Sequence, residues 1–387
     1  MTTSTTYDLI IAGAGPVGLL SALLASQSGL RTLVLEKRAE HIRHSRSIGI
    51  HPPSLQILSR AGILPRFLEH GVQIHRGRAK TDRYTDLGVL DLTDADTPFS
   101  YILTHPQWKT ESLLEAATSR SDTVQLLRNH TITGIDNPVD KDAMATVAAR
   151  TEVGDIKSFR TQFIMACDGK QSKTRTLAGI GYYGKPYALR YAMGDFTDNT
   201  GYGSDAVIFL TRHGLIESFP LSATMRRWVV QQERNPTILH IEALANEIQR
   251  RCGLEPDPGQ CRMFSEFGVE RYHAGCFWHH RVILAGDSAH VVSPIGGQGM
   301  NLGWLNACDA ISGISEIIHH QKRIDKEADA YNITVHRRVR KVIRRAEFNM
   351  MLGSHLALPA MRNQLVKLLL ASPIRNTLRK RITMQGL

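Results

Sequence analysis

The sequence lacks most of the features that mark secreted, membrane-spanning or metal-binding proteins. Its five cysteines are odd in number and include no CxxC pair, and its seventeen histidines include no HExxH motif. This pattern favours free thiols in a reducing compartment over a disulfide framework, and it predicts no protein-bound metal. No run approaches the ~20 apolar residues that span a bilayer, and the polar residues 1–6 argue against a secretory signal. We therefore expect a cytoplasmic protein.

Acidic residues are too few to balance the basic ones, so the formal net charge is +11. Much of the excess follows residue 320, in segments 337–345 and 375–381. These segments have no interleaved aromatic residues and form no known nucleic-acid module, so we expect no nucleic-acid partner. Two interpretations stay open. The charges form a solvated helical face, or residues 364–381, which alternate apolar and basic side chains, make weak peripheral contact with an anionic membrane.

What is present begins with a glycine-rich turn. The apolar run 7–12 (YDLIIA) suits a strand buried on both faces, and it leads directly into Gly13, Gly15 and Gly18. Gly13 allows a tight turn, Gly15 lets the backbone approach a pyrophosphate, and Gly18 lets the following helix pack closely on the strand. The N–H groups at the start of that helix would face the phosphates. The segment predicts a dinucleotide cradle.

The residues after this cradle support the prediction. Apolar residues recur at helical spacing after Gly18, and a second apolar strand, residues 32–35, ends at Glu36. An acid at this position accepts hydrogen bonds from the adenosine ribose. Its charge would repel a ribose 2′-phosphate, which argues against NADP in this cradle.

The middle of the chain changes character after residue 187. Short strand-like runs, at 190–196, 206–211, 215–221 and 227–232, are separated by turn residues. Such a series indicates an antiparallel sheet inserted into an α/β protein. The chain then returns to the nucleotide domain with a strand at 281–285, and it continues into long helices at 299–318 and 325–351.

Three motifs in order give the chain a specific resemblance. They are GAGPVG (13–18), CDGKQSKTR (167–175) and GDSAHVVSPIGGQGMNLG (286–303). With them the chain resembles the class A FAD-dependent aromatic hydroxylases, typified by para-hydroxybenzoate hydroxylase. It is most similar to the ubiquinone-biosynthesis and polyketide-tailoring branches. The resemblance covers about residues 5–350, and we expect no thioredoxin-like C-terminal domain of the kind that several larger members carry.

The resemblance implies an α/β fold in which a Rossmann-like FAD-binding domain carries an inserted antiparallel β-sheet substrate domain and C-terminal helices. The expected FAD-binding domain is discontinuous and comprises residues 1–75, 105–180 and 275–325. The expected substrate domain comprises residues 76–104 and 181–274, and residues 326–387 form the C-terminal helical region.

The resemblance also implies roles for single residues. Asp287 matches the aspartate that binds a ribityl hydroxyl, and Pro294 matches the residue whose carbonyl lies near the reacting edge of the flavin. Gly297 and Gly299 belong to the turn whose N–H groups face the pyrimidine side. The full set of expected FAD-binding residues is Gly13, Gly15, Pro16, Val17, Gly18, Glu36, Lys37, Arg46, Gln107, Asp168, Asp287, Pro294, Gly297, Gly299, Met300 and Asn301.

The implied activity is hydroxylation of an aromatic, phenolic or polyketide-like small molecule with NAD(P)H and O2, through a flavin C4a-hydroperoxide. The resemblance implies no second dinucleotide fold for the nicotinamide, so NAD(P)H is expected to dock transiently, and the basic residues favour NADPH. Candidates for the substrate pocket are named by region only: Tyr191, Arg212, His213 and Tyr272. The alternatives are a prenyl-chain reductase, a flavin-dependent halogenase and a flavin-bound partner protein. The sequence leaves the oligomeric state open.

Overall fold

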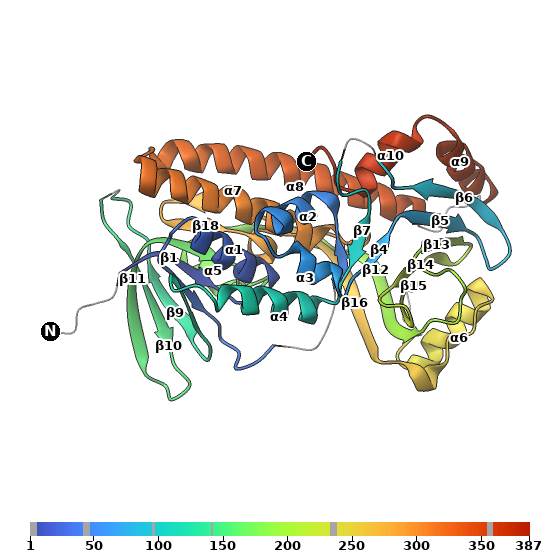
Figure 1. The fold of residues 1–387 in the computed structure, drawn as a ribbon, viewed down its shortest axis with the longest axis horizontal. Helices are drawn as coiled ribbons and strands as arrows, with labels where there is room; N and C mark the ends of the chain where they lie inside the picture. The colour runs from blue at the N-terminus through green and yellow to red at the C-terminus, as the bar shows by residue number, and fades with distance from the viewer. Residues whose placement is uncertain (1–5, 42–46, 95–96, 141, 233–237, 354–358) are drawn as a thin grey trace.

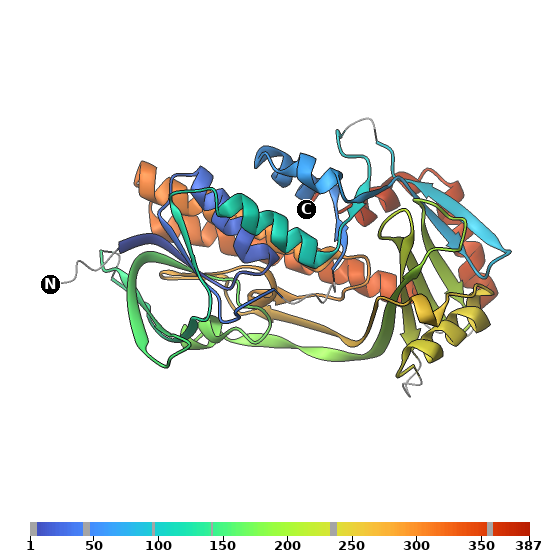
Figure 2. The same ribbon diagram turned by 60° about the horizontal axis from the view of Figure 1, so that its bottom comes forward.

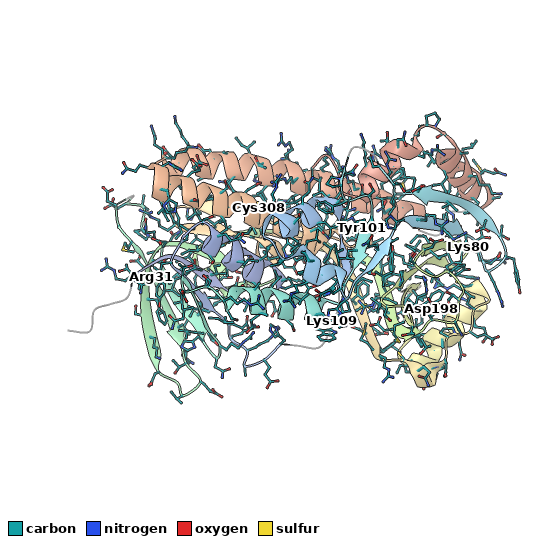
Figure 3. The ribbon with its side chains drawn as sticks, in the orientation of Figure 1. Arg31, Lys80, Tyr101, Lys109, Asp198 and Cys308 are labelled. Atoms are coloured by element: carbon teal, nitrogen blue, oxygen red, sulfur yellow. The ribbon has the colours of Figure 1, made fainter. Side chains whose placement is uncertain are left out.

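The computed structural model describes residues 6–41, 47–94, 97–140, 142–232, 238–353 and 359–387. Two eight-stranded sheets lie towards opposite ends of an elongated molecule, and helices lie along one side of it (Figure 1). The side chains of Lys80 and Asp198 lie at the end that holds the second sheet, whereas Arg31 lies beside the first (Figure 3).

The first sheet has a parallel centre. β1 pairs in parallel with β2 on one side and with β11 on the other, and β8 and β18 continue the parallel order outward. Its strands are β1 (Thr6–Ala12), β2 (Thr32–Leu35), β8 (Val124–Leu127), β9 (Thr131–Asp136), β10 (Ala145–Arg150), β11 (Ile156–Ala166), β17 (Trp278–His279) and β18 (Val282–Leu284). The inner strands are buried almost throughout, as their apolar runs predict.

Helix α1 (Pro16–Gln27) follows β1 and leads to β2, so the predicted strand, glycine turn, helix and second strand are all confirmed. α1 packs between α4 (Gln107–Thr118) and α7 (Gln298–His320). Small side chains such as Ala22 and Ala25 are fully buried on α1, which lets the helix lie close to its neighbours.

The second sheet has the order β19-β16-β12-β15-β14-β13-β5-β6. Its strands are β5 (Arg76–Lys80), β6 (Asp86–Asp91), β12 (Tyr182–Thr197), β13 (Ala206–Thr211), β14 (Gly214–Pro220), β15 (Met225–Gln232), β16 (Met263–Ala274) and β19 (His290–Val291). Most pairs are antiparallel, as predicted, but β13 pairs with β5 in parallel because β5 comes from the distant segment 76–80. The long strands β12 and β16 run from this sheet towards the first (Figure 2).

The two faces of the second sheet are covered differently. Helix α6 (Ile241–Cys252) packs on one face around Phe196, Val207 and Trp228. Helices α9 (Pro359–Ala371) and α10 (Arg375–Ile382) lie beside the opposite face and contact β6. The open space between that face and the helices forms part of the cavity described below.

The remaining elements connect the two sheets. A small antiparallel sheet has the order β3-β7-β4, and helix α8 packs along α7. Their bounds, with those of the short helices, are β3 (Gly49–Ile50), β4 (Val72–Ile74), β7 (Ile102–Thr104), α2 (Pro52–Arg60), α3 (Leu64–Leu68), α5 (Lys173–Leu177) and α8 (Ile324–Gly353). All five cysteines are free thiols. Among the described helices, none combines the length and the apolar composition that crossing a bilayer requires.

Candidate functional site

One large cavity of about 1470 Å³ reaches from the glycine turn after β1 to the inner face of the second sheet. Thirteen of the sixteen expected FAD-binding residues line it: Gly13, Gly15, Pro16, Val17, Glu36, Lys37, Gln107, Asp168, Asp287, Pro294, Gly297, Gly299 and Met300. Gly18 and Asn301 do not line it, and Arg46 lies outside the described residues. The structure therefore gathers residues that are up to 287 positions apart (Gly13 to Met300) around one space.

The glycine turn has the shape that a bound pyrophosphate requires. Gly13 has a φ of +97°, and a Cβ there would lie 2.7 Å from the Cys167 carbonyl oxygen. A Cβ on Gly18 would lie 2.0 Å from the Gly13 oxygen, so this glycine is fixed by helix–strand packing. A Cβ on Gly15 would meet nothing within 4 Å, and Gly15 faces the cavity at the start of α1. The open space beside Gly15 fits a phosphate group.

Glu36 stabilises this turn and also faces the cavity. One carboxylate oxygen accepts a hydrogen bond from the Ala14 N–H at 2.7 Å, and the other accepts one from the Arg38 N–H at 2.9 Å. These bonds fix the glycine turn to the end of β2. Because a carboxylate offers about four acceptor positions, Glu36 keeps acceptor capacity for ribose hydroxyls on its cavity side.

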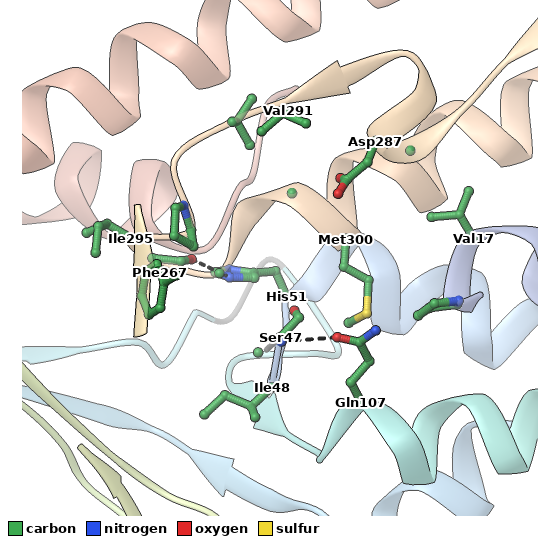
Figure 4. Close-up of a pocket in the computed structure, with 18 of the residues that line it drawn as sticks. Val17, Ser47, Ile48, His51, Gln107, Phe267, Asp287, Val291, Ile295 and Met300 are labelled. Atoms are coloured by element: carbon green, nitrogen blue, oxygen red, sulfur yellow. Dashed lines mark hydrogen bonds between the residues drawn. The ribbon is translucent and has the colours of Figure 1, made fainter. Parts of the chain in front are cut away.

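Asp287 lies in the turn that follows β18. Gly286 precedes it with a φ of +67°, and a Cβ on Gly286 would meet Val17 at 3.0 Å. The Asp287 side chain is directed into the space bordered by Met300 and Val17 (Figure 4). Its position after a strand of the first sheet, beside the glycine turn, suits a carboxylate that accepts hydrogen bonds from a polyol chain.

The N-terminus of α7 points its first N–H groups at the same cavity. Gly296 and Gly297 both have positive φ, and the Gly297 N–H donates to the Pro294 carbonyl at 2.9 Å. This tight turn delivers Gly299 and Met300 to the cavity wall. Unpaired N–H groups and the helix dipole make the end of α7 a site that stabilises negative charge.

Asn301 supports this turn from behind. Its Nδ2 donates to the carbonyls of Gly49 and Gly297, each at 2.8 Å, and its Oδ1 accepts from the His51 N–H at 2.8 Å. The side chain is buried and does not reach the cavity. The expected role in direct contact with the cofactor therefore has no side-chain support, and Asn301 instead ties α7 to the segment before α2.

His51 adds a second tie between the same segments. Its Nε2 is 3.0 Å from the Gly296 carbonyl, to which it donates (Figure 4). Burial lowers the pKa of His51 to about 4, so the ring is neutral at physiological pH. The turn before α7 is thus held by two buried polar side chains, and neither carries a charge.

Gln107 and Asp168 line the cavity but already hold local structure. The Gln107 Oε1 accepts from the Ser47 N–H at 3.3 Å (Figure 4), and its Nε2 donates to Glu111 at 2.9 Å. The Asp168 carboxylate accepts hydrogen bonds from the hydroxyl of Ser172, the N-cap residue of α5, and from the N–H and hydroxyl of Thr174 in its first turn. Both residues remain candidates for contact with FAD, and their side chains also stabilise the local backbone.

Arg175 joins two of the motifs in a way that the sequence did not reveal. Its guanidinium donates to the Ser288 carbonyl at 2.9 Å and to the Lys170 carbonyl at 3.0 Å, and it lies 3.7 Å from the centre of the Tyr182 ring. Arg175 is buried and bonds to backbone carbonyls, so it stabilises the contact between the two motifs from inside the protein.

The four pocket candidates that were named by region do not line the cavity. Tyr191 is buried and stacks on Phe267 at 5.6 Å, and Tyr272 stacks on Tyr182 at 5.4 Å. Arg212 and His213 lie at the turn between β13 and β14. The sequence missed the residues that do face the cavity from this sheet, above all Glu217, because their direction depends on strand register.

The chain is similar in sequence to proteins of known family and activity. A family model described as "FAD binding domain" matches residues 6–346. The chain is 30% identical over 313 residues to a rifampicin monooxygenase of Streptomyces venezuelae, which covers 78% of this chain and 62% of the relative. It is 31% identical over 327 residues to a 12-dehydrotetracycline 5-monooxygenase/anhydrotetracycline 6-monooxygenase of Streptomyces rimosus, which covers 78% of this chain and 61% of the relative. The chain thus spans about three fifths of the length of these relatives.

The fold is also found in solved structures. The p-nitrophenol 4-monooxygenase of Pseudomonas putida DLL-E4 superposes with a TM-score of 0.88 at 22% identity, covering 98% of each chain. At this level of identity the comparison establishes the shared fold.

Proposed function

The chain belongs to the FAD-binding domain family, and from this premise we propose that it is a flavoprotein monooxygenase. It hydroxylates an aromatic, phenolic or polyketide-like small molecule with NAD(P)H and O2. The observation that carries the proposal is the single cavity, which joins the glycine turn to the apolar face of the second sheet and has the α7 N-terminus at the junction. Such a cavity has room for a dinucleotide and a second ring system side by side.

FAD, when bound, supplies the redox and oxygen chemistry. The chain's own residues bind and orient it. The N–H groups at the start of α1 hold the pyrophosphate beside Gly15, while Glu36 and Asp287 accept hydroxyl hydrogen bonds from the two sugar-like parts. The N-terminus of α7 stabilises negative charge on the pyrimidine side of the ring.

The remaining lining excludes water from the reacting edge. Ile48, Phe267, Val291 and Ile295 surround the turn before α7 with apolar surface (Figure 4). A dry site of this kind protects reactive oxygen species from loss to solvent.

The proposed domains follow the two sheets, except that β19 of the second sheet lies in a segment of the FAD-binding domain. Residues 1–75, 105–180 and 275–325 form the FAD-binding domain, and residues 76–104 and 181–274 form the substrate domain. The C-terminal region 326–387 adds Val366, Leu370 and Ile382 to the cavity wall, which supports a share for its helices in substrate binding.

NADPH is the proposed electron donor, and it docks transiently on the surface. A second hollow of about 970 Å³ lies between α8 and α10 and is lined by Arg337, Arg340, Arg344, Arg345 and Arg381. A concentration of cations near one end of the main cavity attracts an anionic nucleotide over several ångströms.

Weak peripheral membrane contact is proposed for the outer face of α9. Met361, Leu365 and Leu368 are exposed at helical spacing on this face. Lys367, Arg375 and Lys380 are exposed close by in the sequence. Apolar side chains flanked by cations are typical of helices that lie in the interface of anionic bilayers.

The monooxygenase proposal is tested by following NADPH and NADH oxidation under labelled dioxygen with the purified yellow protein. The ligands are phenols and polycyclic quinones, each paired with the same ring system without its hydroxyl groups. Ring-stimulated NAD(P)H oxidation with label in the product supports the proposal. Stimulation by prenyl substrates without dioxygen consumption would instead establish the reductase alternative.

A further inference from the structure

Glu217 on β14 occupies the centre of the cavity-facing surface of the second sheet. Across β5, β13, β14, β15, β12 and β16, one transverse row of residues is set by the strand register: Ala79, Ile208, Glu217, Val229, Met193 and Ser265. Every member of this row lines the cavity, and Glu217 is its only titratable member. The register therefore places one carboxyl group in a row whose other members are apolar or weakly polar.

The Glu217 carboxyl is buried without a partner. Glu217 is 6% exposed, and within the described ranges its carboxyl makes no hydrogen bond or ion pair. It does interact electrostatically with Tyr191, because burial raises the pKa of that phenol and the charge of Glu217 raises it further. A buried carboxyl costs free energy unless something binds to it. A group of this kind in a cavity is a functional candidate because stability does not explain its presence.

The charged groups on neighbouring strands do not neutralise Glu217. On β15, Arg227 bonds to both oxygens of Asp195 from β12, at 2.6 and 2.8 Å. On β5, Arg78 donates to Asp205 at 2.6 Å. Both cations are thus paired with carboxylates other than Glu217, and Arg78 shares Asp205 with Arg76.

Two more groups face this region. Arg362 of α9 donates to the backbone carbonyls of Leu210 and Thr211. Tyr191 of β12 is buried, and its hydroxyl has no partner among the described residues. The other residues that α9 and α10 bring to the cavity are apolar: Val366, Leu369, Leu370, Leu378 and Ile382.

We propose that Glu217 is the catalytic acid–base residue of this cavity and that it takes the hydroxyl proton of a phenolic substrate. The phenol O–H bond breaks, an O–H bond forms on the Glu217 carboxylate, and no electron is exchanged in the step. The proton is returned when the product leaves. The phenolate carries more electron density at its ring carbons, which favours transfer of an electrophilic oxygen to them. This inference rests on the proposed hydroxylase function.

The electrostatics of the site agree with such a role. Burial raises the pKa of Glu217 to about 8. A base with a pKa close to the working pH is ionised often enough to accept a proton and basic enough to hold it. The same apolar surroundings favour an uncharged ring over a charged ligand before the proton moves.

The test measures binding without turnover, with 4-nitrophenol as the probe and nitrobenzene as its partner that lacks the hydroxyl. Equilibrium dialysis of the FAD-loaded enzyme gives both dissociation constants from pH 6 to 10, and difference absorbance reports the phenolate. For the wild-type protein we expect a bell-shaped association profile, because the pair binds best when it shares one proton and repels when both are anions. Glu217→Gln should bind 4-nitrophenol about 10-fold more weakly at that optimum. Its fall at high pH should be shallower than that of wild type, because only ionisation of the ligand then weakens binding. Nitrobenzene affinity should not change.

Glu217→Asp is the conservative variant and should keep the bell shape with reduced affinity. Equal 4-nitrophenol binding by wild type and Glu217→Gln would overturn the proposal, and so would a wild-type protein that does not prefer 4-nitrophenol to nitrobenzene. Unchanged flavin content in Glu217→Gln would show that the cradle is intact. If Glu217 governs phenol binding but no labelled oxygen enters any product, then the proposed function fails while the binding role stands. If Glu217→Gln hydroxylates phenols as fast as wild type, then this inference alone fails.

Discussion

At the scale of single residues, two cradle glycines differ in what a methyl group would meet. Gly13→Ala places a Cβ 2.7 Å from the Cys167 carbonyl oxygen at a φ of +97°, so we expect a loss of about 2–4 kcal/mol in the free energy of unfolding. Gly15→Ala places a Cβ in open space at the cavity, so stability should change by less than about 0.5 kcal/mol. FAD affinity of Gly15→Ala should nevertheless fall about 10-fold or more, because the backbone can no longer approach the pyrophosphate.

Urea denaturation of the FAD-free proteins and flavin titration separate the two effects. Each variant is the control for the other, since both add one methyl group within the same turn. Equal loss of stability in the two variants would contradict the geometry of the cradle.

At the scale of elements, Asn301 stabilises the position of the first turn of α7. Its amide makes three hydrogen bonds to β3, to His51 and to Gly297. Asn301→Ala leaves buried N–H and C=O groups without partners, and we expect a loss of about 3 kcal/mol in the free energy of unfolding. Asn376→Ala, an exposed change on α10, is the matched control and should be nearly neutral. An Asn301→Ala protein as stable as the control would mean that the turn before α7 is held by other contacts.

The same elements show what the sequence could predict. The cradle and the long helices α7 and α8 were predictable because continuous apolar runs, glycine turns and helical spacing are local signals. β16 was not predicted, because its polar residues Glu266, Glu270 and Arg271 do not show a clean strand pattern. Glu217 could not be assigned to the cavity because its direction depends on pairing with Ile208 and Val229, and strand register is a tertiary property.

The site residues show the same difference between local sequence signals and tertiary contacts. The chemistry-bearing motifs place Asp287 and the α7 turn at the cavity because motif and backbone geometry are linked. The placement of Asn301 behind the turn, and of Arg175 beneath Ser288, comes from packing between segments more than a hundred residues apart.

At the scale of the whole molecule, three buried histidines link stability to pH. Burial lowers the pKa of His51, His105 and His290 to about 4 each, whereas an unfolded chain has an ordinary value near 6.5. Above pH ~6.5 these rings are neutral in both states, so their contribution is fully present. As pH falls towards ~4, the unfolded chain takes up protons that the folded protein does not, and stability decreases by up to about 3 kcal/mol per histidine.

Urea denaturation between pH 7.5 and 4.5 measures this slope. His290 accepts a hydrogen bond from Asn306 at 2.8 Å, and His290→Gln keeps a polar side chain there while it removes one titrating group. This variant should be less stable at neutral pH but less sensitive to acid, with about one proton fewer taken up on unfolding. A wild-type protein whose stability did not fall between pH 6.5 and 4.5 would show that these rings are already protonated in the folded state.

From the outer face of α9 and the nearby cations we predict that the protein binds anionic membranes weakly. Leu365 and Leu368 are exposed on this face, so the double change Leu365→Ser and Leu368→Ser should abolish co-sedimentation with vesicles that contain phosphatidylserine. Wild type should sediment at low salt and be released at high salt, since each lysine or arginine near an anionic surface contributes only about 1 kcal/mol and is screened. The matched control is Val153→Ser with Ile156→Ser, two exposed apolar residues beside β10 and β11, which should not change sedimentation. If wild type stays in the supernatant at low salt, the C-terminal cations form a solvated helical face, and their charge acts on the nucleotide rather than on a membrane.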